Sequence, residues 1–395
     1  MSMYRKFLVA VSLAGLLLVL WPSAAAQQST QASRWQDPAS VVRLSLPPGV
    51  PLTIASSDLS DTEIYPRGGA LVIDLRCSLV VRNTGTKTVR GVTFAVLAQQ
   101  ITAGGKASVA VPSLNVAPGE SFPVRLSLRL LRPLPGPANP LVEVTADGVL
   151  FDDFGFAGPD QLDSRRKMTV WEMEANRDRH YFKSVLRSQG PEQLQREILA
   201  SFDRQTLRPR LEVRLAGGRV TSSATRAVAG ERVALAFLDL ADSPLELVSG
   251  AAEIDGASAG SPQIRVKNRS PKPVRYFELG WLVQDAAGTR YAAGSVPAPT
   301  SELHLVPGES LSTRQQRRFA FVPKSAELGS FAIGGMGGYV SQVQFEDGSF
   351  WIPSRAALEQ AALMETLPVS AEEQRLTDLY RQKGLQALIN ELNKF

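Results

Sequence analysis

The chain has 395 residues, with 43 Lys+Arg, 38 Asp+Glu, two His and one Cys, and a formal net charge of +5. Apolar residues make up 44% and charged residues 21%, which is typical of globular domains and excludes a wholly disordered or collagenous chain. One cysteine excludes an intrachain disulfide and a cysteine-based zinc cluster, and two histidines leave little material for histidine-centred catalysis. The length predicts two or three domains.

Residues 1–26 have the pattern of a secretory signal peptide. Arg5 and Lys6 form a positive start, residues 7–20 an apolar run, and alanines ending at Ala26 a small-residue cleavage site. The apolar run is too short to cross a bilayer of about 30 Å comfortably. We therefore expect cleavage near Ala26, a secreted or periplasmic protein, and no membrane span in the mature chain.

The main organisational signal is an internal repeat. The segment VRNTGTKTVR at 81–90 recurs as VKNRSPKPVR at 266–275. Three further landmarks recur in the same order: 58–61 with 239–242, 118–121 with 307–310, and 147–148 with 347–348. Because chance rarely keeps four landmarks in order, the sequence predicts a duplicated unit.

Each copy has the pattern of β structure. Runs rich in β-branched and aromatic residues cover 70–75 and 91–97 in the first copy and 276–283 in the second. Asp347-Gly348 between two apolar runs is a strong hairpin signal, and the glycines at 334–338 indicate flexible backbone or a close approach of a partner. Short strands with frequent turn signals favour a β-sandwich.

The order of apolar strand, Val-x-Asn, Gly or Ser turn, second strand, long loop, Pro-Gly-Glu-Ser and further strand resembles bacterial immunoglobulin-like modules. It is most similar to the cell-adhesion-related, CARDB-like group. The resemblance covers roughly 70–130 and 255–322. It implies an exported β-sandwich used for interaction or spacing, and it implies no catalytic residue.

A basic region, 161–226, separates the two copies with 14 Lys+Arg and 8 Asp+Glu. Pro191 begins a helical pattern, and 176–187 have a second apolar face. We expect a helical connector; alternatively, 168–173 form the last strand of the first sandwich. Because acids are mixed with the bases and the chain is predicted to be exported, we expect no nucleic-acid partner.

The C-terminal region is predicted to be helical. Residues 355–367 form one helical pattern, and Ser370 begins a capping box before a second, with Gly384 as a C-cap or a break. Leu388 and Leu392 belong to an apolar face of this second helix, which either packs on the chain itself or binds another chain.

Together these signals predict a mainly β fold with two immunoglobulin-like β-sandwich domains, a helical connector and C-terminal helices. The expected boundaries are 1–26 for the signal peptide, 27–40 for a flexible N-terminal segment, 41–160 for the first sandwich, 161–226 for the connector, 227–353 for the second sandwich and 354–395 for the C-terminal helices.

The favoured function is that of an exported, non-enzymatic scaffold or interaction protein without a cofactor, whose partner is another envelope or extracellular protein. The candidate contact residues are Trp281, Tyr339, Trp351, Leu388 and Leu392. One alternative is a carbohydrate-binding or enzyme-accessory module, in which a glycan stacks on Trp281, Tyr291, Tyr339 and Trp351. Another alternative is a hydrolase that uses Asp152, Asp153 or Asp160 in an acidic loop near 152–163.

Overall fold

The computed structural model describes most of the chain. Its described residues are 41–99, 104–133, 140–206, 211–216, 231–297, 302–314, 318–323 and 331–395. The predicted signal peptide, its cleavage site and the segment 27–40 lie outside these ranges. Strands dominate the described residues and four helices accompany them, which confirms the prediction of a mainly β fold with few helices.

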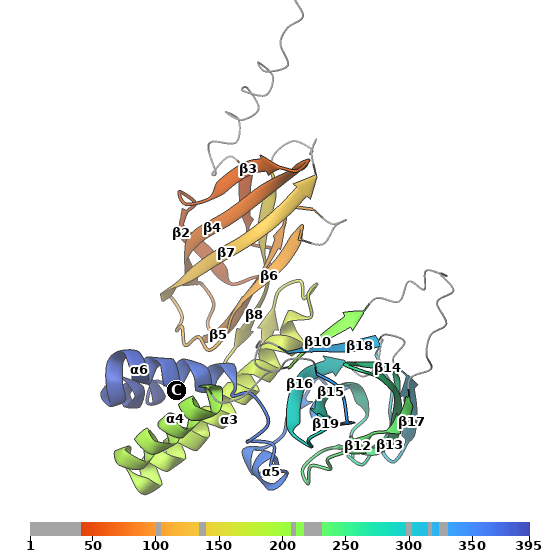
Figure 1. Ribbon diagram of the computed structural model, residues 1–395. Coiled ribbons are helices and arrows are strands. Elements are labelled where there is room, and N and C mark those ends of the chain that lie inside the picture. The colour runs from red at the N-terminus through yellow and green to blue at the C-terminus, as the bar shows by residue number, and fades with distance from the viewer. Residues whose placement is uncertain are drawn as a thin grey trace, which may run out of the picture.

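The first group of strands, which we call the N-terminal β unit, forms two sheets packed face to face (Figure 1). One sheet contains, in order, β1 (Val42–Ser45), β8 (Val142–Phe151), β5 (Val89–Leu97) and β6 (Lys106–Val111), with β9 (Phe156–Ala157) beside β8. In the other, β4 (Ala70–Asn83) pairs with β2 (Leu52–Asp58), β3 (Glu63–Arg67) and β7 (Ser121–Pro133). Alternate residues of β4 point into the core, where Leu71, Ile73 and Leu75 are at most 1% exposed.

The second group of strands, the C-terminal β unit, also encloses a core between two sheets. One sheet contains, in order, β12 (Ala236–Phe237), β19 (Gly335–Phe345), β15 (Val274–Gln284) and β16 (Arg290–Pro297), with β20 (Phe350–Trp351) beside β19. The other contains β10 (Leu211–Ala216), β18 (Arg318–Pro323), β14 (Ser258–Asn268), β13 (Leu245–Asp255) and β11 (Glu231–Ala234), with β17 (Ser310–Arg314) beside β14. Trp281, Phe319 and Phe321 are among its largest buried side chains.

The two units share a strand order in one of their sheets. β1 runs parallel to β8, and β12 runs parallel to β19. In the N-terminal β unit, β5 pairs antiparallel with β8 on one side and with β6 on the other. In the C-terminal β unit, β15 pairs in the same way with β19 and β16. The immunoglobulin-like class of the units stays a prediction.

A buried asparagine closes the same turn in each unit. Asn83 at the end of β4 and Asn268 at the end of β14 are both 0% exposed. Asn83 Nδ2 donates to the carbonyl oxygens of Lys87 at 2.9 Å and Val116 at 3.0 Å. Asn268 Nδ2 donates to those of Lys272 and Leu305, both at 2.9 Å. Each Oδ1 accepts from the backbone N–H two residues further along, at 2.9 Å. These asparagines therefore satisfy backbone groups of two loops from within the core.

A lysine and an aspartate join neighbouring turns in both units. Lys87 pairs with Asp153 at 2.5 Å, and Lys272 pairs with Asp347 at 2.7 Å. The predicted match between 147–148 and 347–348 is therefore wrong: Asp347 occupies the place of Asp153, whereas Asp147 is buried within β8.

The predicted match between 58–61 and 239–242 is also wrong. Leu52 of β2 lies opposite the first turn asparagine, and Leu245 of β13 lies opposite the second, so β2 and β13 occupy corresponding places. Residue 58 ends β2, whereas 239–242 precede β13. The two tetrapeptides are similar in composition but lie at opposite ends of corresponding strands.

The four helices are α3 (Ser164–Gln189), α4 (Pro191–Thr206), α5 (Arg355–Gln360) and α6 (Ala371–Leu392). The helix predicted from Pro191 is confirmed, and so is the cap at Ser370, whose hydroxyl accepts from the backbone N–H of Glu373 at 3.0 Å. The alternative strand at 168–173 is wrong, because these residues lie inside α3. Helix α5 is shorter than predicted, because Ala362 adopts a left-handed conformation with φ 53°.

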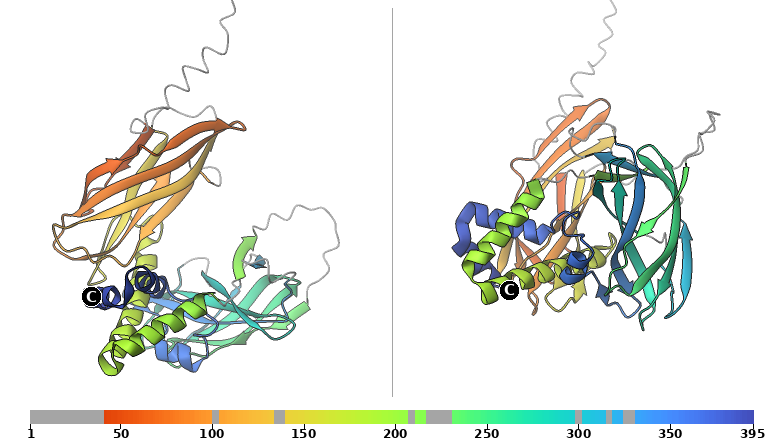
Figure 2. Two further views of the ribbon diagram at one scale, coloured as in Figure 1. Left: turned by 60° about the vertical axis from the view of Figure 1, so that its left-hand side comes forward. Right: turned by 60° about the horizontal axis from the view of Figure 1, so that its bottom comes forward.

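Helices α3, α4 and α6 pack on one another at the junction of the two β units (Figure 2). The fully buried members of their shared core are Phe182, Leu194, Ile198, Leu376, Leu388 and Leu392. Gly384, at φ 78°, breaks α6 as predicted and lets its two halves both reach this core. No helix of the described residues is both long enough and apolar enough to cross a membrane.

The end of the predicted connector belongs to a sheet. Residues 211–216 form β10, which pairs antiparallel with β18 along its whole length. The helical part of the connector therefore ends with α4 at residue 206, and the C-terminal β unit begins before the expected boundary at 227.

We expect Asn83→Ala and Asn268→Ala each to lower the free energy of unfolding by about 1–3 kcal/mol, because each substitution leaves buried carbonyl oxygens without a donor. Urea unfolding followed by circular dichroism measures the change. Asn390→Ala, at an exposed position of α6, is the control and should alter stability by less than about 0.5 kcal/mol. Equal effects at all three positions would contradict the role given to the buried turns.

Cys77 is predicted to be unreactive in the folded protein. The side chain is 2% exposed in β4, and burial raises the pKa of its thiol to about 11. At pH 8 a disulfide reagent such as Ellman's reagent should label it only after unfolding in urea. Stoichiometric labelling within minutes without urea would show that the strand opens locally.

Candidate binding cleft

Helix α3 is anchored at its start by one buried carboxylate of the N-terminal β unit. Asp147 in β8 is 2% exposed. Its Oδ1 accepts from the backbone N–H of Gln161 at 2.9 Å, and its Oδ2 accepts from the backbone N–H of Leu162 at 3.1 Å. The hydroxyl of Ser164 also donates to Oδ2. This carboxylate therefore fixes the place where α3 leaves the β unit.

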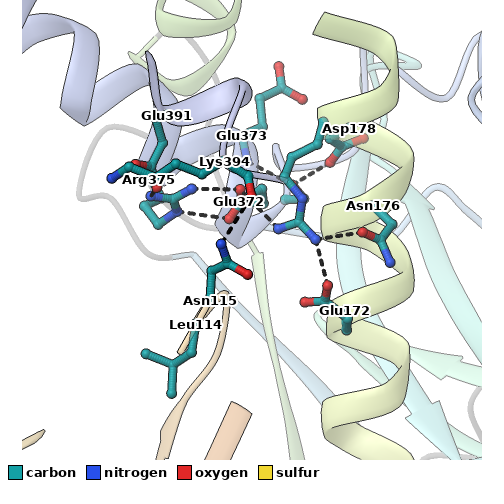
Figure 3. A network of polar contacts seen from close by, with 12 residues as sticks. Leu114, Asn115, Glu172, Asn176, Asp178, Glu372, Glu373, Arg375, Glu391 and Lys394 are labelled. Atoms are coloured by element: carbon teal, nitrogen blue, oxygen red, sulfur yellow. Dashed lines mark hydrogen bonds and ion pairs between the residues drawn. The ribbon is translucent and has the colours of Figure 1, made fainter. Parts of the chain in front are cut away.

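A buried arginine joins α3 to α6 at the centre of the helical junction, and Figure 3 shows its partners Glu172, Asn176 and Glu372. Arg179 is 1% exposed, and its Nη2 donates to Glu172 Oε1 and Asn176 Oδ1 of the same helix, both at 2.6 Å. Its Nη1 donates to Glu372 Oε1 of α6 at 3.2 Å. Since Glu172 and Glu372 are only 4% and 2% exposed, each charge depends on its partners and not on water.

An aromatic ring lies among three arginines at the same junction. The ring centroid of Phe395 lies 4.1 Å from the guanidinium carbon of Arg179, 5.0 Å from that of Arg90 in β5 and 6.0 Å from that of Arg375 in α6. Asn115, between β6 and β7, donates through Nδ2 to the carbonyl oxygen of the residue before Phe395 at 3.0 Å. The N-terminal β unit is thereby joined to the end of α6.

The C-terminal β unit contacts α3 at two separate places. In the first turn of the helix, the guanidinium carbon of Arg166 lies 3.9 Å from the ring centroid of Tyr276 in β15. Three turns later, Arg177 Nη1 donates to the carbonyl oxygen of Pro353 at 3.1 Å. These two contacts hold the outer face of the β12–β19–β15–β16 sheet near the helix.

A cleft of about 470 Å³ lies between α3 and this sheet, and its volume is in the range of small-molecule sites. The helix wall consists of residues spaced by three or four positions, namely Lys167, Val170, Trp171, Glu174, Arg177 and Asp178. The sheet wall includes Glu278, Ala292, Ser295, Tyr339, Ser341 and Gln342. The segment between α5 and α6 closes a third side with Met364, Leu367, Val369 and Ser370.

The basic residues of the cleft are engaged by groups of the chain itself. Arg177 Nε lies 3.1 Å from Asp178 Oδ1, and Arg204 of α4 forms an ion pair with Glu373 of α6. Lys167 Nζ donates to a backbone carbonyl oxygen of the turn before α3, at 2.6 Å. Arg355 lies 4.0 Å from Asp178 and 3.9 Å from Glu373, so both acids have cationic partners within the chain.

Two acidic residues of the cleft have no cationic partner within salt-bridge distance among the described residues. Glu278 accepts from the hydroxyls of Tyr276 at 2.6 Å and Ser295 at 2.9 Å. Glu174 accepts no hydrogen bond from the described residues, although the positive charge of Arg177 lies near it. Burial raises the pKa of Glu174, because removal from water disfavours the ionised form.

The candidate contact residues lie mostly in the interior. Leu388 and Leu392 are 0% exposed in the core of the helical junction, so of the two alternatives for this face of α6 the structure has packing on its own chain. Trp281 and Tyr339 are 2% and 7% exposed, although both line the cleft. Trp351 is half-buried against the core of the C-terminal β unit.

Of the cleft residues, sequence reasoning named only Trp281 and Tyr339 as candidate contacts, and Trp171 and Glu174 are among those it missed. Trp171 is 39% exposed on the helix wall, whereas Tyr291, which was named for sugar stacking, is 6% exposed in a core. The available signal was the mixture of apolar and charged residues at three- and four-residue spacing after residue 164. That signal identifies one helix face only once the whole of 164–189 is read as a helix.

The acidic loop near 152–163 and the glycines at 334–338 have local structural roles. Asp153 pairs with a lysine of the neighbouring turn, and Asp160 Oδ1 accepts from a backbone N–H in the first turn of α3 at 2.9 Å. At Gly337 a Cβ would lie 1.7 Å from the carbonyl oxygen of Ala236, so glycine is needed for β12 to pair there. The close partner of this glycine run is thus the chain's own strand.

No group of three or more His, Cys, Asp or Glu side chains within the described ranges is arranged to hold a metal ion. No protein-family model matches the chain, and no curated protein matches it.

Solved structures give distant matches. One, titled pT26-6p, is 10% identical, with 93% of this chain and 77% of that chain covered and a TM-score of 0.16. A β-glucosidase from Kluyveromyces marxianus is 7% identical, with 71% and 45% covered and a TM-score of 0.15. A red sea bream transglutaminase is 10% identical, with 84% and 34% covered and a TM-score of 0.11. Scores this low carry no argument about the fold or function of the chain.

We expect Arg179→Met to lower the free energy of unfolding by about 1.5–3 kcal/mol, because it removes the charged hydrogen bonds to Glu172 and Glu372, whereas Arg375 still pairs with Glu372 and Arg90 lies 3.9 Å from Glu172. Urea unfolding followed by circular dichroism measures the loss. Arg187→Met, on the exposed side of the same helix, is the matched control and should have little effect. A loss no larger than that of the control would contradict the central role of the buried arginine.

Glu174→Gln should stabilise the protein at pH 7. Burial raises the pKa of this carboxyl in the folded state, so folding disfavours its ionised form, and the wild type loses stability as the pH rises through the folded pKa. The advantage of the variant should therefore shrink as the pH falls toward the unfolded value of about 4.3. Urea midpoints of both proteins between pH 4 and pH 8 test this, and an advantage that does not depend on pH would contradict it.

Proposed function

We propose that the chain is an exported, non-enzymatic interaction protein that binds a partner in the cleft between α3 and the C-terminal β unit. The observation that carries the proposal is the position of this cleft. Its walls belong to a helix and a sheet, and these are joined by stacking and hydrogen bonds on either side of the opening. A site built on rigid elements holds its polar groups in place before a partner arrives, which lowers the entropy cost of binding.

The proposal includes repeated immunoglobulin-like modules as the scaffold. The shared strand order, the two buried turn asparagines and the two lysine–aspartate pairs support a repeated unit. The cleft lies between α3 and the outer sheet face of the second unit, so it arises from the way the helices join the units. The modules then act as a frame, and the junction supplies the site.

Export is part of the same proposal, because the basic start, apolar run and alanine-rich site at 1–26 have the signal-peptide pattern. N-terminal sequencing of the protein recovered outside the cytoplasm should then begin at residue 27. An intact N-terminus in that material would refute cleavage at the predicted site.

Blocking the cleft tests the binding role. Ser341→Trp places a large side chain on the sheet wall, and Ser188→Trp places the same side chain on an exposed position of α3 outside the cleft. Chemical cross-linking in the source organism, followed by mass spectrometry of the purified protein, compares both variants with the wild type. Circular dichroism of both variants first establishes that they fold.

We expect at least one exported protein to be cross-linked by the wild type and by Ser188→Trp and to be reduced at least about tenfold with Ser341→Trp. The same set of cross-linked proteins from all three would refute the cleft as the contact site. Absence of any cross-linked protein would refute the interaction role itself.

A further inference from the structure

Most of the charges that line the cleft have partners within the chain. Asp178 and Glu373 are each paired with an arginine, and Lys167 donates to a backbone carbonyl oxygen at the end of the helix wall. Glu174 on the helix wall and Glu278 on the sheet wall form no ion pair within the described residues, because Arg177, three positions after Glu174, is directed to Asp178 and to the carbonyl oxygen of Pro353. These two carboxylates are therefore the charged groups of the cleft that a bound cation could still pair with.

Glu174 is the less satisfied of these two carboxylates. Glu278 receives two hydroxyl donors, whereas Glu174 receives no hydrogen bond within the described part of the chain. It is half-buried in the helix wall, and burial raises its pKa. A half-buried carboxylate without donors is destabilising, and a cation placed beside it would remove the cost.

Apolar and aromatic groups surround this carboxylate. Trp171 precedes Glu174 by three positions on the same helix face, and Tyr339 lines the opposite wall. The faces of such rings attract cations. Val170 and Val369 add aliphatic surface that fits a short alkyl chain.

We propose that the cleft binds a cation at the end of a short alkyl chain, a primary ammonium group, with Glu174 as its counter-ion and Trp171 and Tyr339 beside it. This inference rests on the proposed binding role of the cleft and names the chemistry that it recognises. A free alkylamine and the side chain of a lysine in a partner protein present the same group.

A series of probes of equal length isolates the charge. n-Pentylammonium, pentan-1-ol and pentanoate have similar alkyl chains and end in a cationic, a neutral and an anionic group. Nα-acetyl-lysine methylamide and its Nε-acetylated form compare a charged with a neutral lysine side chain. Binding of each to the full chain is measured by NMR titration. We expect saturable binding of n-pentylammonium or of the lysine derivative, and at least about tenfold weaker binding of the neutral and anionic probes.

Two variants assign the binding to Glu174. Glu174→Gln removes the charge and keeps the shape, and it should weaken ammonium binding at least about tenfold. Glu192→Gln, at an exposed position at the start of α4, is the matched control and should leave binding unchanged. The urea midpoint of each variant confirms that it is folded.

The outcomes separate this inference from the proposed function. Tighter binding of the lysine derivative than of the free amine identifies a protein-borne group, and the reverse identifies a small amine. Equal binding of charged and neutral probes, equal loss in both variants, or saturable binding only of a neutral sugar such as cellobiose would overturn the ammonium site. The cleft would still be a contact site if Ser341→Trp abolished cross-linking.

Discussion

The buried guanidinium of Arg179 is the interaction on which the arrangement of the chain depends. It bonds carboxylates of α3 and α6, and the ring that covers it also meets Arg90 of the N-terminal β unit. A buried ion pair adds little to stability compared with a well-packed apolar core, but it tolerates few alternative arrangements because each charge needs its partner. The network therefore restricts how the helices and the β units fit together more than it increases their stability.

The cleft follows from this restriction. Helix α3 begins at a buried aspartate of β8 and meets α6 through Arg179, so its exposed face has a defined position when the C-terminal β unit packs against it. One stacking contact, of Arg166 with Tyr276, and one hydrogen bond, from Arg177 to Pro353, join the helix to the C-terminal β unit. Between these two contacts the helix and the sheet are separated by the cleft and do not pack directly. Glu174 in that gap is predicted to lower stability at neutral pH, because burial raises its pKa, and such a local cost is typical of binding sites.

Local features of the chain could be predicted from the sequence. The helix after Pro191, the cap at Ser370 and the break at Gly384 depend on residues within one or two turns of each other, and all three are confirmed. The strand-rich character of both units follows from β-branched runs and turn residues. Each of these signals acts over a short stretch of sequence, where the local backbone preference decides the outcome.

Features that join distant residues could not be predicted. Arg179 and Glu372 are 193 positions apart, and nothing near either residue identifies the other. The apolar face with Leu388 was visible in the sequence, but its partner was not, so burial against α3 and α4 could not be distinguished from an exposed contact. The cleft depends on how far the exposed face of α3 lies from the outer face of the β12–β19–β15–β16 sheet. A single sequence does not show that distance.

The most direct test of the fixed arrangement is a distance measurement between the two β units. Cysteines introduced at Ser57 of β2 and Ser249 of β13, both exposed, accept nitroxide labels, while the native thiol is buried. Pulsed electron paramagnetic resonance then reports the distribution of distances between the labels. A single narrow distribution is predicted, and a broad distribution like that of two units on a flexible linker would contradict the account.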